Sequence, residues 1–237
     1  MAEPYLTSPA RWTQTTLESR PDLGFIDKAD SGGTPATVDP DLWDGDIPWL
    51  TPKEITGLEN NIFVSRTERN ISKLGLETSA AKLLPVGTVL LTKRAPVGAV
   101  AINVVPMATN QGFLNFQCGP RLRPMYLAFW LAANKPYLDL VANGSTYPEL
   151  YKNDLFEFQI AVPTLEEQDE ILKAMAAVQL VIALASSLEQ SVLSASEIVN
   201  LQKQNRRLRE IRNALLPLLI SGQLPTSHVE KALARTI

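Results

Sequence analysis

The stretch FEFQIAVPTLEEQDEILKAM, residues 156–175, joins two parts of the chain that differ in character. In residues 156–162 apolar side chains alternate with others, and a period of two predicts a half-buried β-strand. Pro163 then ends the strand, because proline has no backbone N–H to donate. Thr164 is followed three residues later by Glu167, the pattern of a capping box that begins a helix. The stretch therefore predicts a boundary between a sheet-containing domain and a helical segment.

The composition of the chain changes at the same place. Of its 237 residues, 15 of 17 prolines, 11 of 12 glycines and all 16 aromatic residues lie at or before Pro163. The following 53 residues contain none of these three kinds. A continuous helix of this length would be about 80 Å long. We therefore predict three parts: a globular domain over 1–163, a long helix or helix pair over 164–222 and a tail over 223–237.

The first part is predicted to have an α/β (α+β) fold. Residues 87–93 and 98–105 are short runs rich in β-branched and other apolar residues, separated by a turn. Residues 124–144 have a helical pattern, which Pro136 breaks or kinks and a final Asn-Gly pair ends. The many prolines and glycines indicate a curved, irregular sheet with a few helices packed on it. With 45% hydrophobic residues in the chain, such a domain can bury a real core.

The second part is predicted to be helical, with an apolar stripe that packs against a partner. So long a helix is not stable alone in water unless its stripe is covered. Apolar residues at four- and three-residue spacing predict two coiled-coil seams, Ile171, Met175, Val178 and Ile182 in the first and Ile198, Leu201, Leu208 and Leu215 in the second. The seams are offset by one residue, which predicts a kink, a change of partner or a break into two helices around residues 185–196. A helix packed only on its own domain is the alternative.

Charge and cysteine content limit the class of protein. The formal net charge is −3, and the single cysteine, Cys118, fits a reducing cytoplasm without disulfides. The N-terminus lacks the pattern of a secretory signal, and no apolar run is long enough to span a membrane. Residues 51–135 nevertheless hold ten Lys or Arg against four Asp or Glu. These charges predict either a local positive surface or scattered solvated charges. The negative net charge alone argues against a nucleic-acid-binding protein.

The sequence predicts no catalytic residue, metal or cofactor. The single histidine, His228, and the single cysteine cannot assemble a metal site of these ligands. Residues 39–46 are rich in carboxylates but lack the spacing of a calcium loop, and we interpret them as an acidic turn. No phosphate-binding or dinucleotide loop is present. Residues 134–137, NKPY, are similar to the base-gripping tetrapeptide of amino-methyltransferases, but they lie in a helical pattern and no glycine-rich cofactor loop precedes them.

Several loops carry residues that can contact DNA, although a structural turn is the alternative for each. SGGTPAT, residues 31–37, can wrap tightly because glycine tolerates positive φ. Cations can meet phosphates, and amide side chains can bond the edge of adenine. The candidate DNA-binding residues are the cations Lys53, Arg66, Arg69, Lys73, Lys93 and Arg94, the amides Asn110 and Gln111, and Ser145, Thr146 and Tyr147 near a helix start.

Taken in order, these elements resemble one family. The series GGTP, IPWLTPKEI, GTVLLTKRAPVGAVAI, NQGF, NGST and VPTLEEQDEI is similar to the specificity subunits of type I restriction–modification enzymes, from about Trp12 to Gly222. The resemblance implies that residues 1–163 are a target recognition domain that reads double-stranded DNA. It implies that the helices act as a spacer and dock modification methyltransferase subunits, which bind S-adenosylmethionine. A restriction or translocase subunit would perform any cleavage, and the chain itself would be non-catalytic.

Members of this family typically carry two recognition domains and two helices, whereas this sequence has one GGTP and one NGST. The resemblance therefore implies a half-subunit, which would pair as a homodimer through its helices and direct the complex to a bipartite palindromic site. Two other functions stay open. The chain could be a non-catalytic protein–protein adaptor that dimerises through its helices, or a methyltransferase acting through NKPY.

Overall fold

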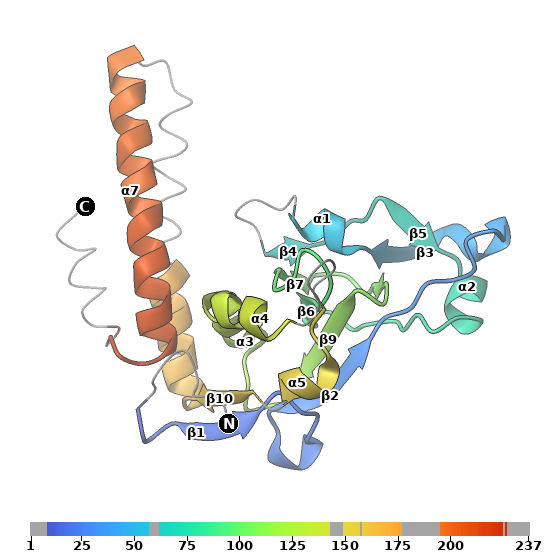
Figure 1. Cartoon of the computed structure of the whole chain (residues 1–237), viewed down its shortest axis with the longest axis horizontal. Helices are drawn as coiled ribbons and strands as arrows, with labels where there is room; N and C mark the ends of the chain where they lie inside the picture. The colour runs from blue at the N-terminus through green and yellow to red at the C-terminus, as the bar shows by residue number, and fades with distance from the viewer. Residues whose placement is uncertain are drawn as a thin grey trace. The chain divides into compact units, whose positions relative to one another are not determined.

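The computed structural model describes residues 9–56, 62–142, 149–156, 158–176, 195–224 and 226, with the backbone alone over 195–205. These residues fall into two compact units (Figure 1). Unit 1 comprises residues 14–162. Unit 2 comprises residues 9–13 together with the chain from Pro163 onward.

Unit 1 is built on a five-stranded sheet. Its order is β2 (Ile26–Ser31), β9 (Phe113–Cys118), β6 (Val89–Thr92), β7 (Val100–Asn103) and β4 (Phe63–Val64). The pairs β2–β9, β9–β6 and β6–β7 are antiparallel, and β4 runs parallel to β7. Strands β6 and β7 confirm the two short β-rich runs that the sequence predicts. Because β6 is buried along its whole length, it forms the centre of the core.

A second, three-stranded sheet carries β5 (Arg69–Ile71), β3 (Trp43–Leu50) and β8 (Ala108–Thr109) in that order. The prediction of an acidic turn over residues 39–46 is wrong in its second half. The 3₁₀ turn η2 (Pro40–Leu42) is followed at once by β3, so Trp43 already lies in a strand. A bulge allows this, because Trp43 and Ile47 both stand opposite Ile71.

The strand predicted over residues 156–162 is shorter than its alternation suggests. Phe156 ends the short helix α5 (Lys152–Phe156), and β10 (Gln159–Val162) begins three residues later and pairs with β1 (Thr13–Thr16). Its last three residues are all buried, so the strand does not alternate. The predicted alternation is wrong because the alanine at position 161 is buried, and the predicted start is wrong because residues 152–156 form helix α5.

The helical pattern of residues 124–144 is broken rather than kinked, and the break lies at Asn134 instead of Pro136, while the predicted Asn-Gly end lies outside the described residues. Helix α3 (Pro124–Ala133) ends at Asn134, and Pro136 lies in the first turn of α4 (Lys135–Val141). The buried Asn134 side chain donates to the carbonyl of Trp130 at 2.8 Å, while Tyr137 packs on Phe158 with ring centres 4.5 Å apart. NKPY is therefore a structural junction between helices, and α3 packs on β6 and β7.

The remaining short elements of unit 1 are η1 (Pro21–Leu23), α1 (Pro52–Thr56) and α2 (Lys73–Glu77). Two apolar clusters make up the core described around the sheets. One surrounds Leu50, Met107 and Phe113, and the other surrounds Trp49 and Ile71. The mixed α/β fold with open sheets agrees with the predicted fold class.

Unit 2 contains a helix over residues 165–176 and the helix α7 (Ala195–Ile220). The predicted capping box is confirmed. The backbone N–H of Thr164 donates to Glu167 Oε2 at 3.1 Å, and the backbone N–H of Glu167 donates to Thr164 Oγ1 at 3.3 Å. At the other end α7 continues past Pro217, and Gly222 then adopts a left-handed φ of 71°.

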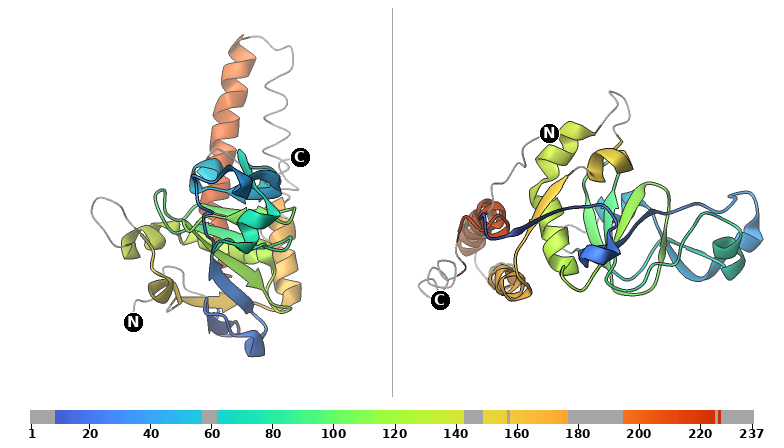
Figure 2. Two further views of the ribbon diagram at one scale, coloured as in Figure 1. Left: turned by 90° about the vertical axis from the view of Figure 1, so that its right-hand side faces the viewer. Right: turned by 90° about the horizontal axis from the view of Figure 1, so that it is seen from below.

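The beginning and the end of the helical segment lie on the same short stretch of chain. Arg11 Nη2 donates to Glu167 Oε1 at 2.9 Å. A Cβ atom placed on Gly222 would come within 2.6 Å of Trp12 Cζ2. A single straight helix about 80 Å long cannot bring its two ends together in this way. The described residues of unit 2 therefore belong to more than one helix, with the helix over 165–176 and α7 drawn as separate ribbons in Figure 2. The predicted break around 185–196 falls largely outside the described residues.

Within the described residues, no helix is both long and apolar enough to cross a membrane.

Candidate nucleic-acid interface

Four loops that are distant in sequence meet in unit 1. The backbone N–H of Gly33 donates to the carbonyl of Thr109 at 2.9 Å, and that of Asn110 donates to Leu50 at 3.0 Å. The backbone N–H of Lys93 donates to the carbonyl of Gly112 at 2.8 Å. These bonds join segments 32–36, 49–52, 92–94 and 110–112, which we call the motif junction. Each segment belongs to a different stretch of the series that resembles the family.

The paired glycines of the motif junction are required for close approach of the backbone. A Cβ atom on Gly32 would collide with the carbonyl of Thr109, and one on Gly33 would collide with the backbone of Ala80 and Ala81. Neither glycine has a positive φ, so the predicted reason for this pair is wrong. The loop is tight because another segment lies directly against it, which the sequence does not show.

Two tryptophans of β3 hold the glycine loop in place. Trp49 Nε1 donates to the carbonyl of Gly33 at 2.9 Å, and Trp43 Nε1 donates to that of Ala36 at 3.0 Å. The two indoles pack edge to face at 5.0 Å, and the Arg69 guanidinium lies over the Trp43 ring at 3.5 Å. Sequence reasoning missed both tryptophans, although buried indoles that need an acceptor are a usable signal.

The glutamate half of a capping box fixes the start of α1 beside the motif junction, while the backbone N–H of Glu54 donates to the carbonyl of Thr51 at 3.2 Å. Glu54 Oε2 accepts from the backbone N–H of Thr51 at 2.7 Å and from its hydroxyl at 2.6 Å. The other oxygen, Oε1, accepts from the backbone N–H of Glu68 at 2.7 Å, which ties the loop before β5 to this helix. The TPKE pattern, with proline in the first turn, was a signal that could have found it.

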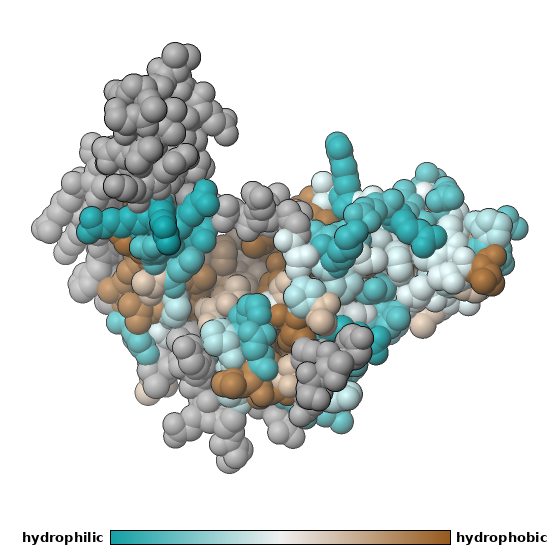
Figure 3. Space-filling view, turned by 45° about the horizontal axis from the view of Figure 1, so that its top comes forward, coloured by the Kyte–Doolittle hydropathy of each residue, from teal (hydrophilic) through white to brown (hydrophobic). Residues whose placement is uncertain are grey.

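The predicted cations around β5 lie on an exposed edge of unit 1. Lys53 pairs with Glu68 at 3.9 Å and Lys73 pairs with Glu77 at 3.6 Å, and both lysines are more than four-fifths exposed. Such pairs are worth about 0–1 kcal/mol and break easily. Arg66 is exposed and makes no ion pair within the described part of the chain. Figure 3 shows mostly hydrophilic residues along this edge.

The predicted pair Lys93 and Arg94 faces a carboxylate. Glu149 Oε1 lies 3.5 Å from Lys93 Nζ and 3.1 Å from Arg94 Nε. Backbone pairing fixes this contact, because the N–H of Leu150 donates to the carbonyl of Lys93 at 2.8 Å and Arg94 forms a β-bridge with Glu149. The two cations thus share one carboxylate. The expectation from the sequence that both contact phosphates stays a prediction.

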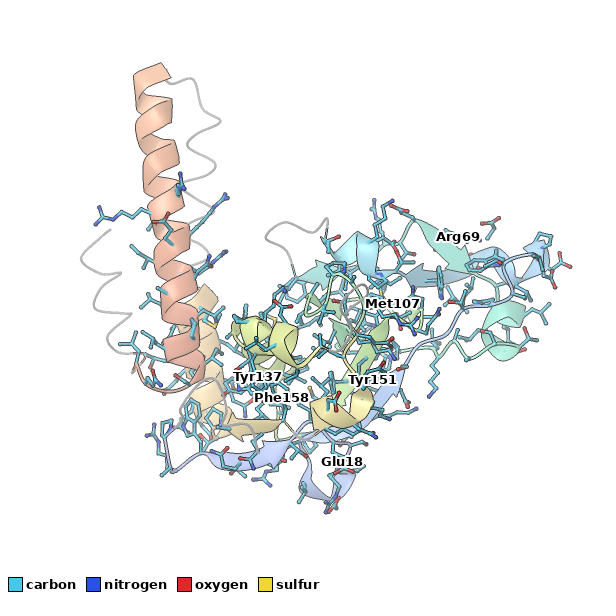
Figure 4. The ribbon with its side chains drawn as sticks, in the orientation of Figure 1. Glu18, Arg69, Met107, Tyr137, Tyr151 and Phe158 are labelled. Atoms are coloured by element: carbon cyan, nitrogen blue, oxygen red, sulfur yellow. The ribbon has the colours of Figure 1, made fainter. Side chains whose placement is uncertain are left out.

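The amide side chains are partly engaged within the motif junction. Asn110 Oδ1 accepts from the backbone N–H of Gly112 at 2.8 Å, and Gln111 Oε1 accepts from the Thr34 hydroxyl at 2.5 Å. Their oxygens are therefore used internally, while no bond from their amino groups is made to the residues described. The remaining candidates Ser145, Thr146 and Tyr147 lie outside the described residues. Figure 4 shows the surrounding side chains, with Met107 and Arg69 labelled.

Residues 22–193 match the family model of the type I restriction modification DNA specificity domain. The chain belongs to this family. Over 148 residues it is 41% identical to the MjaIX specificity subunit of Methanocaldococcus jannaschii, a match that covers 62% of this chain and 34% of that protein. Over 219 residues it is 25% identical to the HindI specificity subunit of Haemophilus influenzae, covering 91% of this chain and 42% of that one.

Solved structures of type I restriction–modification proteins share the fold. The HsdS subunit of Thermoanaerobacter tengcongensis gives a TM-score of 0.50 at 18% identity, over 94% of this chain and 48% of that one. A chain from a study of complex assembly and conformational transition in a type I restriction–modification system gives a TM-score of 0.55 at 19% identity. This match covers 94% of this chain and 49% of that chain. The chain thus spans less than half the length of each of these four relatives.

In this member of the specificity family, the predicted helix-interface residues have different environments. Ile171 and Met175 are 4% and 9% exposed, so they are already buried within the single chain. Leu208 and Leu215 are half-buried on α7. Ile198 and Leu201 lie in α7, but their side chains, like Val178 and Ile182 as a whole, are outside the described part.

The described residues of this specificity-family chain contain no group of three or more His, Cys, Asp or Glu that could hold a metal ion. Cys118 is unlike a reactive thiol. Burial, together with the nearby Asp27 carboxylate, raises the pKa of the Cys118 thiol to about 12. It therefore stays protonated near neutral pH, where the thiolate is the nucleophile.

Proposed function

We propose that unit 1 is a target recognition domain that reads the sequence of double-stranded DNA. The observation that carries this proposal is the motif junction, where four stretches that resemble the specificity family meet in a chain that belongs to that family. Loops held by buried indoles and close backbone contacts are preorganised. Such loops lose little entropy when they bind, which favours recognition by shape and hydrogen bonds.

The proposed contacts divide into two kinds. Lys53, Arg66, Arg69 and Lys73 lie on or beside the exposed edge of unit 1 and would meet phosphates, which position the protein. The amino groups of Asn110 and Gln111 would face bases, because an amide can bond adenine. We also retain Ser145, Thr146 and Tyr147 as candidate contacts.

The proposed role of unit 2 is to pair two copies of the chain and to bind the modification subunits. Its helices would act as a coiled-coil spacer, pair two copies of the chain as a homodimer and bind modification methyltransferase subunits. Those subunits would bind S-adenosylmethionine and perform the chemistry, with a restriction or translocase subunit for any cleavage. The chain itself would be non-catalytic. Two copies related by a twofold axis would read a bipartite palindromic site.

Enrichment of duplexes from a random pool tests this function. The chain is incubated with the pool alone and with its modification subunits, and bound DNA is sequenced over several rounds. We expect a short sequence repeated in inverted orientation across a fixed gap. A pool that yields no common sequence under either condition would contradict DNA recognition, while a single unrepeated motif would contradict the homodimer only.

The homodimer has its own test on α7. Ile211 is 44% exposed in the single chain, whereas Ile171 is buried and would disturb folding if changed. Ile211→Glu should convert a dimer into a monomer by light scattering at micromolar concentration. The matched control is Asn213→Glu, also exposed on α7 but away from the apolar stripe. A wild-type chain that is monomeric in the same measurement would contradict the proposed homodimer.

The second candidate function is a protein–protein adaptor that dimerises through its helices. The net charge of −3 and the pairing of Lys93 and Arg94 with the Glu149 carboxylate favour it. Salt dependence separates the two. DNA affinity should fall steeply between about 50 and 200 mM salt because counterions are released, whereas an adaptor has no duplex affinity to lose.

A further inference from the structure

Arg94 differs from the other candidate cations because a carboxylate holds one side of its guanidinium. Glu149 Oε1 approaches Arg94 Nε at 3.1 Å, and no bond from the two terminal amino groups is made to any residue that the structure describes. The Arg94 side chain is 50% exposed, while those of Lys93 and Glu149 are 16% and 22% exposed. The guanidinium is therefore fixed on its inner side and open on its outer side.

The charge of this group is a poor match for a phosphate. Lys93, Arg94 and Glu149 together carry a net charge of +1, and the carboxylate lies within ion-pair distance of both cations. A phosphate brought to Arg94 would meet the repulsion of Glu149 as well as the attraction of the cations. Phosphate contacts contribute through net charge, so the three groups offer a phosphate one net positive charge where two unpaired cations would offer two.

The geometry matches a base edge. Guanine presents two acceptors in the major groove, O6 and N7, and arginine satisfies both with a pair of parallel N–H bonds. A carboxylate on Nε leaves the two terminal amino groups for this contact and limits the rotation of the guanidinium. Glu149 is itself held by its backbone bridge to Arg94 and by the bond from Leu150 to Lys93.

We propose that Arg94 reads a guanine in the recognised site and that Glu149 positions it. Lys93 is a positioning residue as well, because its ammonium lies 3.5 Å from Glu149 and its side chain is mostly covered. This inference rests on the proposed function of unit 1 as a DNA reader. It replaces the sequence-based expectation that Lys93 and Arg94 contact phosphates alike.

The test uses the duplex that the wild-type chain enriches, with each base pair replaced in turn. Arg94→Ala should remove discrimination at one G·C pair, a loss of about 5- to 100-fold, and leave the other positions unchanged. Arg94→Lys keeps the charge but loses the paired N–H donors of the guanidinium. It should therefore lose the same discrimination while the salt dependence of binding stays unchanged. Arg66→Ala is the control and should weaken all duplexes equally, with a salt slope lower by about 0.9.

Glu149→Gln gives an effect that a merely structural residue would not produce. It should strengthen binding to unrelated duplexes, because two cations are released, while weakening discrimination at the same G·C pair. A uniform loss of affinity in Arg94→Ala on all duplexes, with a smaller salt slope, would identify a phosphate contact and overturn the inference alone. A wild-type chain that enriches no sequence would overturn the proposed function and this inference with it.

Discussion

Each unit contains a Thr-x-x-Glu helix start whose glutamate accepts from the threonine N–H, reciprocally as a full capping box only in unit 2, and the two glutamates hold different parts of the chain. In unit 1 the half-box of Thr51 and Glu54 uses the second carboxylate oxygen to accept from the backbone N–H of Glu68. In unit 2 the box of Thr164 and Glu167 uses it to bind the side chain of Arg11, 156 residues away in sequence. The same local pattern thus closes a loop in one unit and attaches the N-terminal segment to a helix in the other.

The surroundings of the two boxes differ in burial. The motif junction beside the first box is held by buried tryptophans and by glycines that lie directly against other backbone. The second box depends on an ion pair whose Arg11 side chain is 68% exposed. Stability in unit 1 should therefore respond to changes of shape, and stability at the start of helix 165–176 should respond to changes of charge.

The largest effect should come from Gly32→Ala. Its Cβ would collide with the carbonyl of Thr109, which belongs to a strand and cannot move alone. We expect a loss of about 3 kcal/mol in the free energy of unfolding of unit 1, measured by chemical denaturation. Gly87→Ala is the control, since Gly87 has open space around it and only a positive φ of 84°, and should cost about 1–2 kcal/mol. Equal losses would show that close approach is not the reason for Gly32.

A smaller effect is expected for Trp49→Phe. The change removes the buried donor to the carbonyl of Gly33 and should lower the free energy of unfolding by about 2 kcal/mol. Trp43→Phe is the matched variant, and it should cost less because the lost acceptor, the carbonyl of Ala36, is on an exposed residue that water can reach. The reverse order in denaturation midpoints would contradict the role given to Trp49.

The smallest effect concerns acid. Burial alone would raise the pKa of the Glu167 carboxyl, but bonds from the Arg11 guanidinium and the Thr164 N–H hold that pKa below its ordinary value of 4.5. A depressed pKa stabilises the fold above 4.5, and this contribution is lost as the pH falls through the folded value.

Glu167→Gln should therefore cost less than about 1 kcal/mol at pH 7 and should flatten the fall of stability between neutral and acidic pH. Thermal unfolding followed by circular dichroism from pH 7 to pH 3 measures both. Glu166→Gln is the control, because Glu166 is exposed in the first turn of the same helix and makes no ion pair with the described residues, and it should leave the acid slope unchanged. If Glu167→Gln leaves the fall of stability between neutral and acidic pH unchanged, the Glu167 carboxylate does not stabilise the start of this helix.

Local patterns were predictable from the sequence, and contacts between distant segments were not. The box of Thr164 and Glu167 and the strands β6 and β7 follow from neighbouring residues, and all three were predicted. The partner of Lys93 and Arg94 is Glu149, on a segment whose pairing with theirs nothing local indicates. For the same reason the sequence predicts a tight turn at the glycine pair, whereas in the structure glycine is needed there because the backbone of another loop lies directly against it.

The return of the helical segment to residues 11 and 12 also depends on a distant contact. A run without proline or glycine predicts helix, and it does so equally for one helix and for two. Only the contacts of Glu167 with Arg11 and of Gly222 with Trp12 decide between them. The proposed spacer is accordingly shorter than the length of the run suggested.

The central claim is that unit 1, through its motif junction, contacts the bases. The most direct measurement is photo-crosslinking of the enriched duplex, carrying 5-iodouracil at successive positions, followed by mass spectrometry of the attached peptides. The account predicts cross-links to peptides that contain residues 32–37, 92–94 or 110–112, and their loss when a duplex of unrelated sequence is used. Cross-links confined to α7, with none in unit 1, would contradict it.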